Sequence, residues 1–517
     1  MLSKIFSCGV FGIDGFTVTV ECSAWDRIPR FDLVGLPDTA VKEAKNRVQS
    51  ACENSGIRFP TLDIMINLAP ADIKKEGSAF DLAILIAILK SDRTIPADVD
   101  LSTSAFIGEL SLSGEVRPVS GVLSRTLAAR EAGIRDIYVP IANAGEAAVV
   151  EGVRVFGVTS LRRLIDHIKG FAPIEPTPRN VDAFDFSPLD TGCDFSDVRG
   201  QAKAKRALEI AAAGGHNVLM IGPPGAGKSM LAKRLPTILP DMTFDEAVET
   251  TRIHSAVGVL GTNLITRRPF RSPHHTVSSP GLIGGGTTPR PGEISLAHNG
   301  ILFLDELPEF PKSVTEALRQ PLEDGQVSVI RAAAKMNFPA SFMLVCAMNP
   351  CKCGFFGSQT RQCTCSAAMR GKYLDRISGP LLDRIDIEIE LPSVSFSDLS
   401  GAGRPGEPSA VIRERVNASR RFTDERLKRA GEKPGTLNGR MTPQMIRRHC
   451  ELDAEGAEML RLAFETIGLT ARGHDRILRV ARTIADLEES ERVLADHIAE
   501  AIMYRSLDRK YWRNDII

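Results

Sequence analysis

The sequence of 517 residues has no long apolar run and no net charge. No run approaches the roughly 20 apolar residues of a membrane-spanning helix, so we expect no membrane partner. Residues 1–8 lack a long apolar stretch and a small-residue cleavage site, so we also expect no signal peptide. The 64 basic residues balance the 64 acidic ones, and a basic surface for nucleic acid must therefore be local.

Cysteine is also scarce for a chain of this length. Ten cysteines in 517 residues do not form the dense framework of a small disulfide-stapled secreted domain, and that class is excluded. We therefore expect a protein of the reducing cytoplasm. The length predicts about three domains, at roughly 150 residues for each domain.

What the chain does contain is a glycine-rich loop between an apolar strand (218–221) and a helix (230–235). The loop matches Gly-x-x-x-x-Gly-Lys-Ser, in which backbone N–H groups wrap a polyphosphate, lysine reaches the β- and γ-phosphates and serine binds Mg²⁺. An accidental glycine turn is the alternative, but the flanking strand and helix argue against it. The residues of the loop are Gly222, Pro223, Pro224, Gly225, Ala226, Gly227, Lys228 and Ser229.

Two further apolar strands end in polar residues that can handle a nucleotide. Residues 300–304 lead to Asp305, which can hold Mg²⁺ through water, and to Glu306, which can orient the attacking water. A buried strand that ends in acids by chance is the alternative, and the glycine-rich loop upstream argues against it. Residues 342–348 lead in the same way to Asn349.

In this order the motifs resemble those of AAA+ ATPases. The resemblance implies that Asn349 is the sensor-1 residue, which positions water near the γ-phosphate. It also implies that Arg384, within Leu-Leu-Asp-Arg-Ile-Asp (381–386), is an arginine finger for the neighbouring subunit's site. Arg376 is the alternative finger. The alternative for Arg384 is a surface arginine that pairs with a neighbouring aspartate.

Arg472 opens a helix near the end of the chain and resembles the sensor-2 arginine, which reaches the γ-phosphate from the lid. Arg476 and Arg479 are the alternatives for this role. The resemblance implies that Mg²⁺-ATP binds between core and lid, and that an oligomer completes the site.

Residues 269–292 are rich in glycine and proline and contain His274 and His275. This composition argues against a packed helix, and a long loop in a compact domain is usually functional. The stretch resembles the magnesium-chelatase-type branch of AAA+ proteins and, within it, the YifB/ComM family, in which such inserts line the pore of a ring. No third metal ligand is suitably spaced, so we interpret both histidines as loop or substrate contacts.

Residues 1–170 resemble the proteolytic domain of Lon proteases, which implies a ribosomal S5-like α/β fold. The match is carried by residues 106–118 and 127–134. The serine and lysine of the Lon dyad fall on Ala79 and Arg125, and neither can act as nucleophile or base.

A dyad displaced by one residue is the alternative, because Ser78 is adjacent and Lys74 and Lys75 are near. We favour a structural or partner-binding domain that lacks peptidase activity, since the nucleophile–base pair is missing at the matching positions.

Four cysteines lie close together in a stretch that also contains two glycines. Four thiolates can surround one tetrahedral Zn²⁺, and four protein ligands leave no open position, so the metal would be structural. The spacing is Cys-x-Cys, and reduced thiols or a labile disulfide are the alternatives. The candidate ligands are Cys351, Cys353, Cys363 and Cys365.

Past residue 395 the chain is helical and basic, and residues 411–430 hold seven basic side chains. Two interpretations compete, a solvated helix face and a surface that faces nucleic acid. The seven residues are Arg413, Arg415, Arg420, Arg421, Arg426, Lys428 and Arg429.

The sequence thus predicts an α/β protein with an inactive Lon-like domain (1–170), a linker (171–195), an AAA+ core (196–395) and a helical lid (396–517). The resemblance implies a hexameric ATPase that uses ATP and Mg²⁺ and acts on single-stranded or branched DNA. Its implied role is that of a branch-migration helicase in natural transformation and recombination. An ATP-dependent protease, and a magnesium-chelatase-type motor that acts on a protein partner, are the alternatives.

Overall fold

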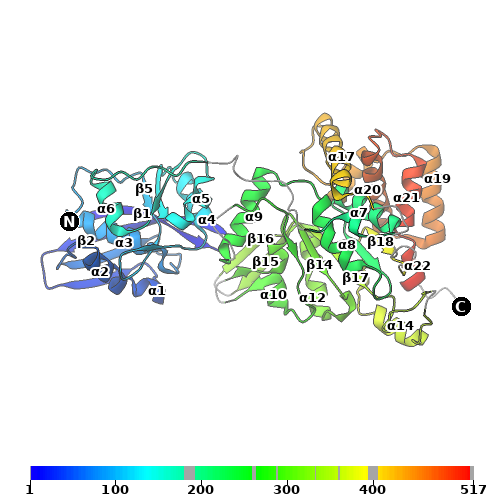
Figure 1. Ribbon diagram of the computed structural model, residues 1–517, viewed down its shortest axis with the longest axis horizontal. Coiled ribbons are helices and arrows are strands. Elements are labelled where there is room, and N and C mark those ends of the chain that lie inside the picture. Colours follow the sequence, from blue (N-terminus) through cyan, green and yellow to red (C-terminus); the bar gives the residue numbers. More distant parts are fainter. Residues whose placement is uncertain are drawn as a thin grey trace. The chain divides into compact units, whose positions relative to one another are not determined.

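A computed structural model describes residues 2–179, 192–258, 264–286, 289–331, 334–358, 361–393 and 406–512. The chain divides into two compact units, which we describe separately (Figure 1). Unit 1 holds Met1–Asp185 and Phe244–Thr266, and unit 2 holds Phe186–Thr243 and Arg267–Ile517. Residues 180–191 of the predicted linker and the predicted boundary at 395/396 lie outside the described residues.

Unit 1 is built on a mixed sheet of seven strands in the order β3-β4-β2-β1-β5-β8-β9. β1 pairs with β2, and β2 with β4, in antiparallel fashion, whereas the other neighbours are parallel. The strands are β1 (Leu2–Phe11), β2 (Asp14–Trp25), β3 (Arg30–Val34), β4 (Asp63–Ala69), β5 (Ser104–Phe106), β8 (Asp136–Pro140) and β9 (Arg154–Val158). From the sequence we expect strands over 16–22, 31–36, 64–68 and 136–140, and β2, β3, β4 and β8 confirm them. Neither β1 nor β9 is expected from the sequence.

The sequence also predicts a strand over 106–112, and this prediction is wrong in its extent. β5 ends at Phe106, and the chain leaves the sheet because the N–H of Gly108 donates to the carbonyl of Ala79 at 2.9 Å. A short strand β6 (Glu109–Leu110) then pairs with β7 (Val116–Arg117) in a separate two-stranded sheet.

Helices cover both faces of the large sheet. α2 (Ala44–Asn54), α3 (Asp81–Ser91) and α6 (Leu161–Ile168) share one apolar core, and α4 (Val122–Glu131) and α5 (Ala144–Ala148) share another. The cores are separate because successive side chains of a strand point to opposite faces. Tyr138, for example, lies in the first core and stacks between Phe106 and Phe156, at ring-centroid distances of 4.7 and 4.9 Å.

α9 (Phe244–Ala256) belongs to unit 1 although the sequence predicts one continuous ATPase core over 196–395. The helix packs against α4. The N–H of Gly121 donates to Ser255 Oγ at 3.0 Å, and Arg252 donates to Asp14 at 2.8 Å. A segment from within the ATPase sequence therefore completes the Lon-like unit.

Unit 2 contains a parallel sheet of five strands in the order β11-β14-β17-β10-β18. The strands are β10 (Val218–Ile221), β11 (Phe270–Arg271), β14 (Ile301–Leu304), β17 (Met343–Met348) and β18 (Ile387–Glu390). β10, β14 and β17 are buried along their whole length, as continuous apolar runs in parallel sheets predict. Because all pairings are parallel, the carboxyl ends of the five strands lie at one edge of the sheet.

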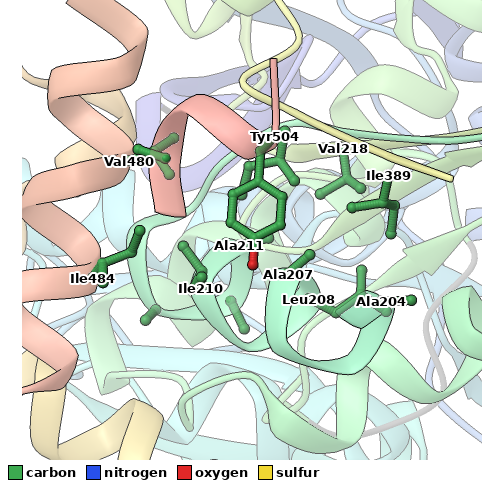
Figure 2. Packing of buried hydrophobic residues seen from close by; sticks show 14 of the residues in the cluster. Ala204, Ala207, Leu208, Ile210, Ala211, Val218, Ile389, Val480, Ile484 and Tyr504 are labelled. Atoms are coloured by element: carbon green, nitrogen blue, oxygen red, sulfur yellow. The ribbon is translucent and has the colours of Figure 1, made fainter. Parts of the chain in front are cut away.

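α7 (Ala202–Gly214) lies at the centre of the core of unit 2, as Figure 2 shows. It packs between Val218 and Ile389 of the sheet and Val480 and Ile484 of α20 (Ala471–Leu487). The alanine-rich sequence of α7 allows this close approach on both sides. Tyr504 lies in the same core, and its hydroxyl donates to Glu500 at 3.0 Å.

From the sequence we expect helices over 411–430, 442–450, 454–467 and 496–504, and four helices of unit 2 confirm them. They are α17 (Ser409–Arg429), α18 (Pro443–His449), α19 (Ala454–Ala463) and α21 (Ala495–Met503). One further helix, α22 (Leu507–Trp512), follows α21, although the sequence predicts that the helix over 496–504 is the last one. The composition of residues 269–292 argues against a helix, but this stretch contains the short helix α10 (Ser279–Ile283). The helix forms because Ser278 caps its first turn by accepting a hydrogen bond from the N–H of Gly281. Across the described residues, no helix is both long and apolar enough to span a membrane.

Candidate nucleotide-binding site

The glycine-rich loop lies at the carboxyl end of β10, and Lys228 opens α8 (Lys228–Arg234). Gly225 and Gly227 have φ angles of +79° and +92°, which glycine adopts without a steric penalty. Lys228 Nζ donates to the carbonyl oxygens of Gly222 and Pro223 at 2.6 and 2.9 Å, and so lies over the loop. Burial lowers the pKa of Lys228, and the nearby acids oppose this effect. The loop thus has the shape and the cation that a polyphosphate requires.

Ser229 and Asp305 are brought together by neighbouring elements. The hydroxyl of Ser229 donates to Asp305 Oδ2 at 2.6 Å, where α8 begins and β14 has just ended. A hydroxyl and a carboxylate are the oxygen ligands that Mg²⁺ takes in phosphate sites. Both predicted metal ligands therefore fit one Mg²⁺.

Asn349 follows β17 and completes this cluster. Its Oδ1 accepts from Lys228 Nζ at 3.0 Å. The structure therefore brings Lys228, Ser229, Asp305 and Asn349 to one edge of the sheet, as expected for the carboxyl ends of parallel strands.

Glu306 has a left-handed backbone with φ of +54°, and its side chain is 59% exposed. This conformation is uncommon for a non-glycine residue and is typical of functional sites. His275 Nδ1 lies 3.8 Å from Glu306 Oε2, and the His275 ring lies 4.1 Å from that of His274. The stretch 269–292 thus touches the acid that was predicted to activate water. The sequence gave no signal for this contact.

Arg384 and Arg472 lie at the opposite edge of the sheet. Both line a pocket of about 470 Å³, together with Asn217 and Asp386. Asn217 immediately precedes β10, and Asp386 immediately precedes β18, so the pocket lies at the amino ends of these strands. Four residues of strand span about 13 Å. The lid of one chain therefore does not deliver Arg472 to the phosphate loop of that chain.

The side chain of Arg384 is only 10% exposed and donates to Glu323 and to the carbonyl of Pro380. Its Nε has no hydrogen-bond partner in the part of the chain that the structure describes. Arg472 is 64% exposed and lies 3.7 Å from Asp383. Arg384 is thus held by Glu323 and not by the adjacent aspartates that the sequence offered.

Arg376, the alternative finger, lies elsewhere. It donates to the carbonyl of Pro308 at 3.1 Å and to Glu309 at 2.9 Å, and both partners closely follow Glu306 in the chain. Arg376 is therefore near the Glu306 segment of its own chain, apart from the pocket that Arg384 and Arg472 share.

The four clustered cysteines have the geometry of a metal site. Their sulfurs lie within 4.8 Å of one another, and three of the sulfur–sulfur distances are 3.4, 3.6 and 3.7 Å. A ZnS₄ tetrahedron with bonds of about 2.3 Å has edges of about 3.8 Å, whereas a disulfide bond is about 2.05 Å long. Hydrogen bonding from the N–H of Phe355 lowers the pKa of Cys353 to about 5, which favours a thiolate. The residues therefore fit a structural Zn²⁺.

This cysteine loop packs directly against the phosphate loop. A Cβ at Gly354 would lie 2.6 Å from Pro224 Cδ, closer than any side chain tolerates. Gly354 has φ of +87°, which also favours glycine. The candidate zinc loop therefore supports the phosphate loop from outside, a contact that the sequence did not reveal.

The basic run of α17 is mostly occupied within the chain. Five of its seven members have partners: Arg415 with Glu209 and Glu407, Arg420 with the carbonyl of Ala212, Arg421 with Glu414, Arg426 with Asp486 and Arg429 with Glu491. Neutralised or buried guanidinium groups are poor contacts for phosphate. The structure favours the interpretation of a helix face over that of a nucleic-acid surface.

In the Lon-like unit, the position of the catalytic lysine is filled by a buried arginine. Arg125 donates to the carbonyls of Cys8 and Ser120, and burial lowers its pKa to about 10. The displaced dyad is not formed, because Ser78 donates to Glu109 and the buried Lys75 donates to the carbonyl of Pro70.

The sequence of this chain is similar to those of several known proteins. Residues 194–399 match the family described as magnesium chelatase, subunit ChlI; residues 20–143 and 406–505 match two further models of that subunit, the latter its C-terminal part. The chain is 43% identical over 511 residues to competence protein ComM of Haemophilus influenzae, covering 98% of both chains. It is 42% identical over 509 residues to uncharacterized protein YifB of Escherichia coli, again covering 98% of both. Over 144 residues it is 27% identical to Lon protease 2 of Bacillus subtilis, covering 27% of this chain and 25% of that one.

Proposed function

Since this chain belongs to the YifB/ComM family of magnesium-chelatase-type AAA+ proteins, we propose that it hydrolyses Mg²⁺-ATP at a site shared by two subunits of a ring. The observation that carries the proposal is the cluster of Lys228, Ser229, Asp305 and Asn349 around one loop. These four side chains come from three separate motifs, and together they supply the cation, the metal ligands and a polar group for the γ-phosphate.

The residues of the site have distinct roles in phosphoryl transfer. Lys228 leaves the carbonyls of Gly222 and Pro223 and binds the β- and γ-phosphates, which offer it more negative charge. Ser229 and Asp305 would hold Mg²⁺, which would supply positive charge beside the phosphate oxygens. The exposed carboxylate of Glu306 polarises the attacking water, and Asn349 orients it. Catalysis here consists of positioning and electrostatic stabilisation.

Arg384 and Arg472 complete the site of the adjacent subunit. They share a pocket at the amino ends of the strands, whereas the phosphate loop lies at the carboxyl ends. The amino-end pocket of one subunit can meet the carboxyl-end phosphate loop of another only in a head-to-tail contact. Such contacts close into a ring when the rotation between successive subunits divides a full turn evenly. We propose a hexamer, in which the unpartnered Nε of Arg384 contributes to charge stabilisation in the neighbouring site.

We further propose that the four cysteines hold one structural Zn²⁺. The tetrahedral spacing of their sulfurs and the contact between Gly354 and Pro224 support this role. The metal would fix the loop against which the phosphate loop rests.

The proposed substrate is DNA, single-stranded or branched, which the ring would move during strand exchange or branch migration. A related protein carries the name competence protein ComM, and the family resemblance implies a role in natural transformation. The contact of His275 with Glu306 supports a substrate-facing role for residues 269–292. A ligand bound by this stretch would change the position or the charge environment of the catalytic acid. Since α17 is mostly paired internally, the DNA contact is assigned to the pore.

The experiment that tests the substrate is ATP turnover with single-stranded, duplex or forked DNA, with casein, or with no addition. Stimulation by DNA that weakens steeply with salt supports the proposal. Stimulation by casein without cleavage would instead favour a motor that acts on protein. Cleavage of casein would favour a protease, against which Ala79 and the buried Arg125 argue.

A further inference from the structure

We infer that Asn217 is a positioning residue, which fixes the arginine finger Arg384 and ties it to the strands that carry the phosphate loop and Asn349. The inference rests on the proposed shared site. It adds a link within one subunit between its own nucleotide and the arginine that it presents to its neighbour.

The side chain of Asn217 bridges two segments. Its Nδ2 donates to the carbonyl of Arg384 at 2.8 Å, and its Oδ1 accepts from the N–H of Leu344 at 2.9 Å. Leu344 belongs to β17, whose carboxyl end carries Asn349. One amide group thus connects the backbone of the finger to the strand of the predicted sensor.

The backbone of Asn217 binds the same finger segment a second time. Its carbonyl accepts from the N–H groups of Asp386 and Ile387 at 3.0 and 3.1 Å, and its N–H donates to Asp386 Oδ2 at 3.1 Å. Residues 384–387 are therefore held by Asn217 at several points, immediately before β10 begins.

This link runs the length of the sheet. β10 extends from Asn217 at one edge to the phosphate loop at the other, and β17 extends from near Leu344 to Asn349. β10 and β17 are paired in parallel, with Val218 opposite Val345 and Ile221 opposite Met348. A packed, hydrogen-bonded strand moves as one piece. A shift of the phosphate loop or of Asn349 on ATP binding is therefore transmitted to the carbonyl of Arg384.

The guanidinium of Arg384 depends on this anchor. Its side chain is 10% exposed, and its guanidinium donates to Glu323 and to the carbonyl of Pro380 while its Nε has no partner among the described residues. The backbone of residue 384 and these two contacts together fix where the group points, so a shift of that backbone displaces the guanidinium. A catalytic group displaced by about 1 Å can lose roughly 100-fold in rate. Asn217 affects hydrolysis in the neighbouring site, although it touches no nucleotide itself.

The test uses the full chain and mixed rings. Asn217→Ala should bind a fluorescent ATP analogue as the wild type does, while ATP turnover falls by about ten- to 100-fold. Mixing it with an equal amount of Glu306→Gln should restore turnover to about a quarter of that of the wild type, because random assembly pairs an intact Glu306 with an intact finger at that frequency. A residue that merely stabilises its own strand would not be rescued in this way.

Two controls separate the outcomes. Asn143→Ala also removes a bridging amide, between Asn143 and the backbone of Val119 in unit 1, and should leave turnover unchanged. Arg384→Ala mixed with Glu306→Gln tests the shared site itself. If that mixture is rescued while Asn217→Ala is not, the inference is overturned and the shared site stands. If neither is rescued, the shared site fails and the inference fails with it.

Asn217→Asp keeps the acceptor for the N–H of Leu344 but loses the donor to Arg384. It takes the place of Asn217→Ala if the alanine variant does not fold, with the same expected results. Full turnover of either folded variant alone would also overturn the inference.

Discussion

The hydroxyl of Ser229 lies 2.6 Å from a carboxylate oxygen of Asp305, although 76 residues separate them in the chain. One residue opens the helix after the phosphate loop, and the other follows a strand two places along the sheet. The pair shows that two motifs form one metal-binding corner.

Replacement of Lys228 by alanine should abolish nucleotide binding or turnover. The substitution removes the cation that lies over the phosphate loop, and loss of one such group costs about 100-fold or more in rate. Binding of a fluorescent ATP analogue and phosphate release measure the effect. Lys233→Ala, on the same helix but exposed, is the matched control and should behave like the wild type. Normal turnover of Lys228→Ala would remove the loop from the site.

Glu306→Gln should separate binding from hydrolysis. The amide preserves the shape of the side chain but cannot polarise water, so ATP should remain bound while turnover falls by about 100-fold or more. Filter binding of labelled ATP and a turnover assay check both parts. Glu309→Gln, which alters an exposed acid paired with Arg376, should retain most activity. Unchanged turnover of Glu306→Gln would show that another group activates the water.

The reduced protein should contain about one zinc per chain, because four thiolates satisfy one tetrahedral ion. Gly354→Ala should weaken nucleotide binding, since the new methyl group meets Pro224 and the backbone is left-handed, at a cost of about 1–3 kcal/mol. Elemental analysis and nucleotide titration measure these effects. Cys193→Ser lies outside the cluster and should keep the metal, whereas Cys363→Ser should lose it. A metal-free protein with normal nucleotide affinity would contradict the zinc assignment.

The contribution of Asp81 to the stability of the Lon-like unit should increase as the pH falls from about 7 toward 4. Burial raises the pKa of Asp81 from 3.8 to about 6, although Arg47 opposes the shift. A folded-state pKa above the unfolded one means that the folded protein binds the proton more tightly, so this contribution is lost as the pH rises through 6. The melting temperature of the wild type relative to Asp81→Asn should therefore rise on acidification. Between pH 7 and pH 4, the free energy of unfolding of the wild type relative to Asp81→Asn should change by an amount on the order of 2–3 kcal/mol. A difference that does not change with pH would show that the carboxyl titrates normally.

The phosphate-loop corner was predictable from sequence because each motif carries its own local context. Asp305 and Asn349 each follow an apolar strand directly. Because the carboxyl ends of parallel strands lie at the same edge of a sheet, this pattern predicts that both side chains lie at that edge. The cysteine cluster was predictable for a similar reason: its four ligands lie within a single short loop.

Other features depend on packing that no local pattern encodes. The resemblance implies that Arg472 reaches a γ-phosphate from the lid, but it does not say where this arginine lies within its own chain. Because α20 packs on α7, Arg472 lies in the pocket at the amino ends of the strands, and its role there stays a prediction. α9 lies within the ATPase sequence but packs in unit 1, because Ser255 and Arg252 form hydrogen bonds with residues of that unit. The bridging role of Asn217 is likewise invisible in sequence, where it is one polar residue before a strand.

The central claim is that each ATP site combines the phosphate loop of one subunit with Arg384 of the next. The most direct measurement is the ATP turnover of Arg384→Ala and Glu306→Gln, each alone and then mixed in equal amounts. Each variant alone should be nearly inactive. The mixture should regain about a quarter of wild-type turnover, because each subunit supplies the part that the other lacks. If the mixture stays as inactive as the separate variants, the site is not shared between subunits.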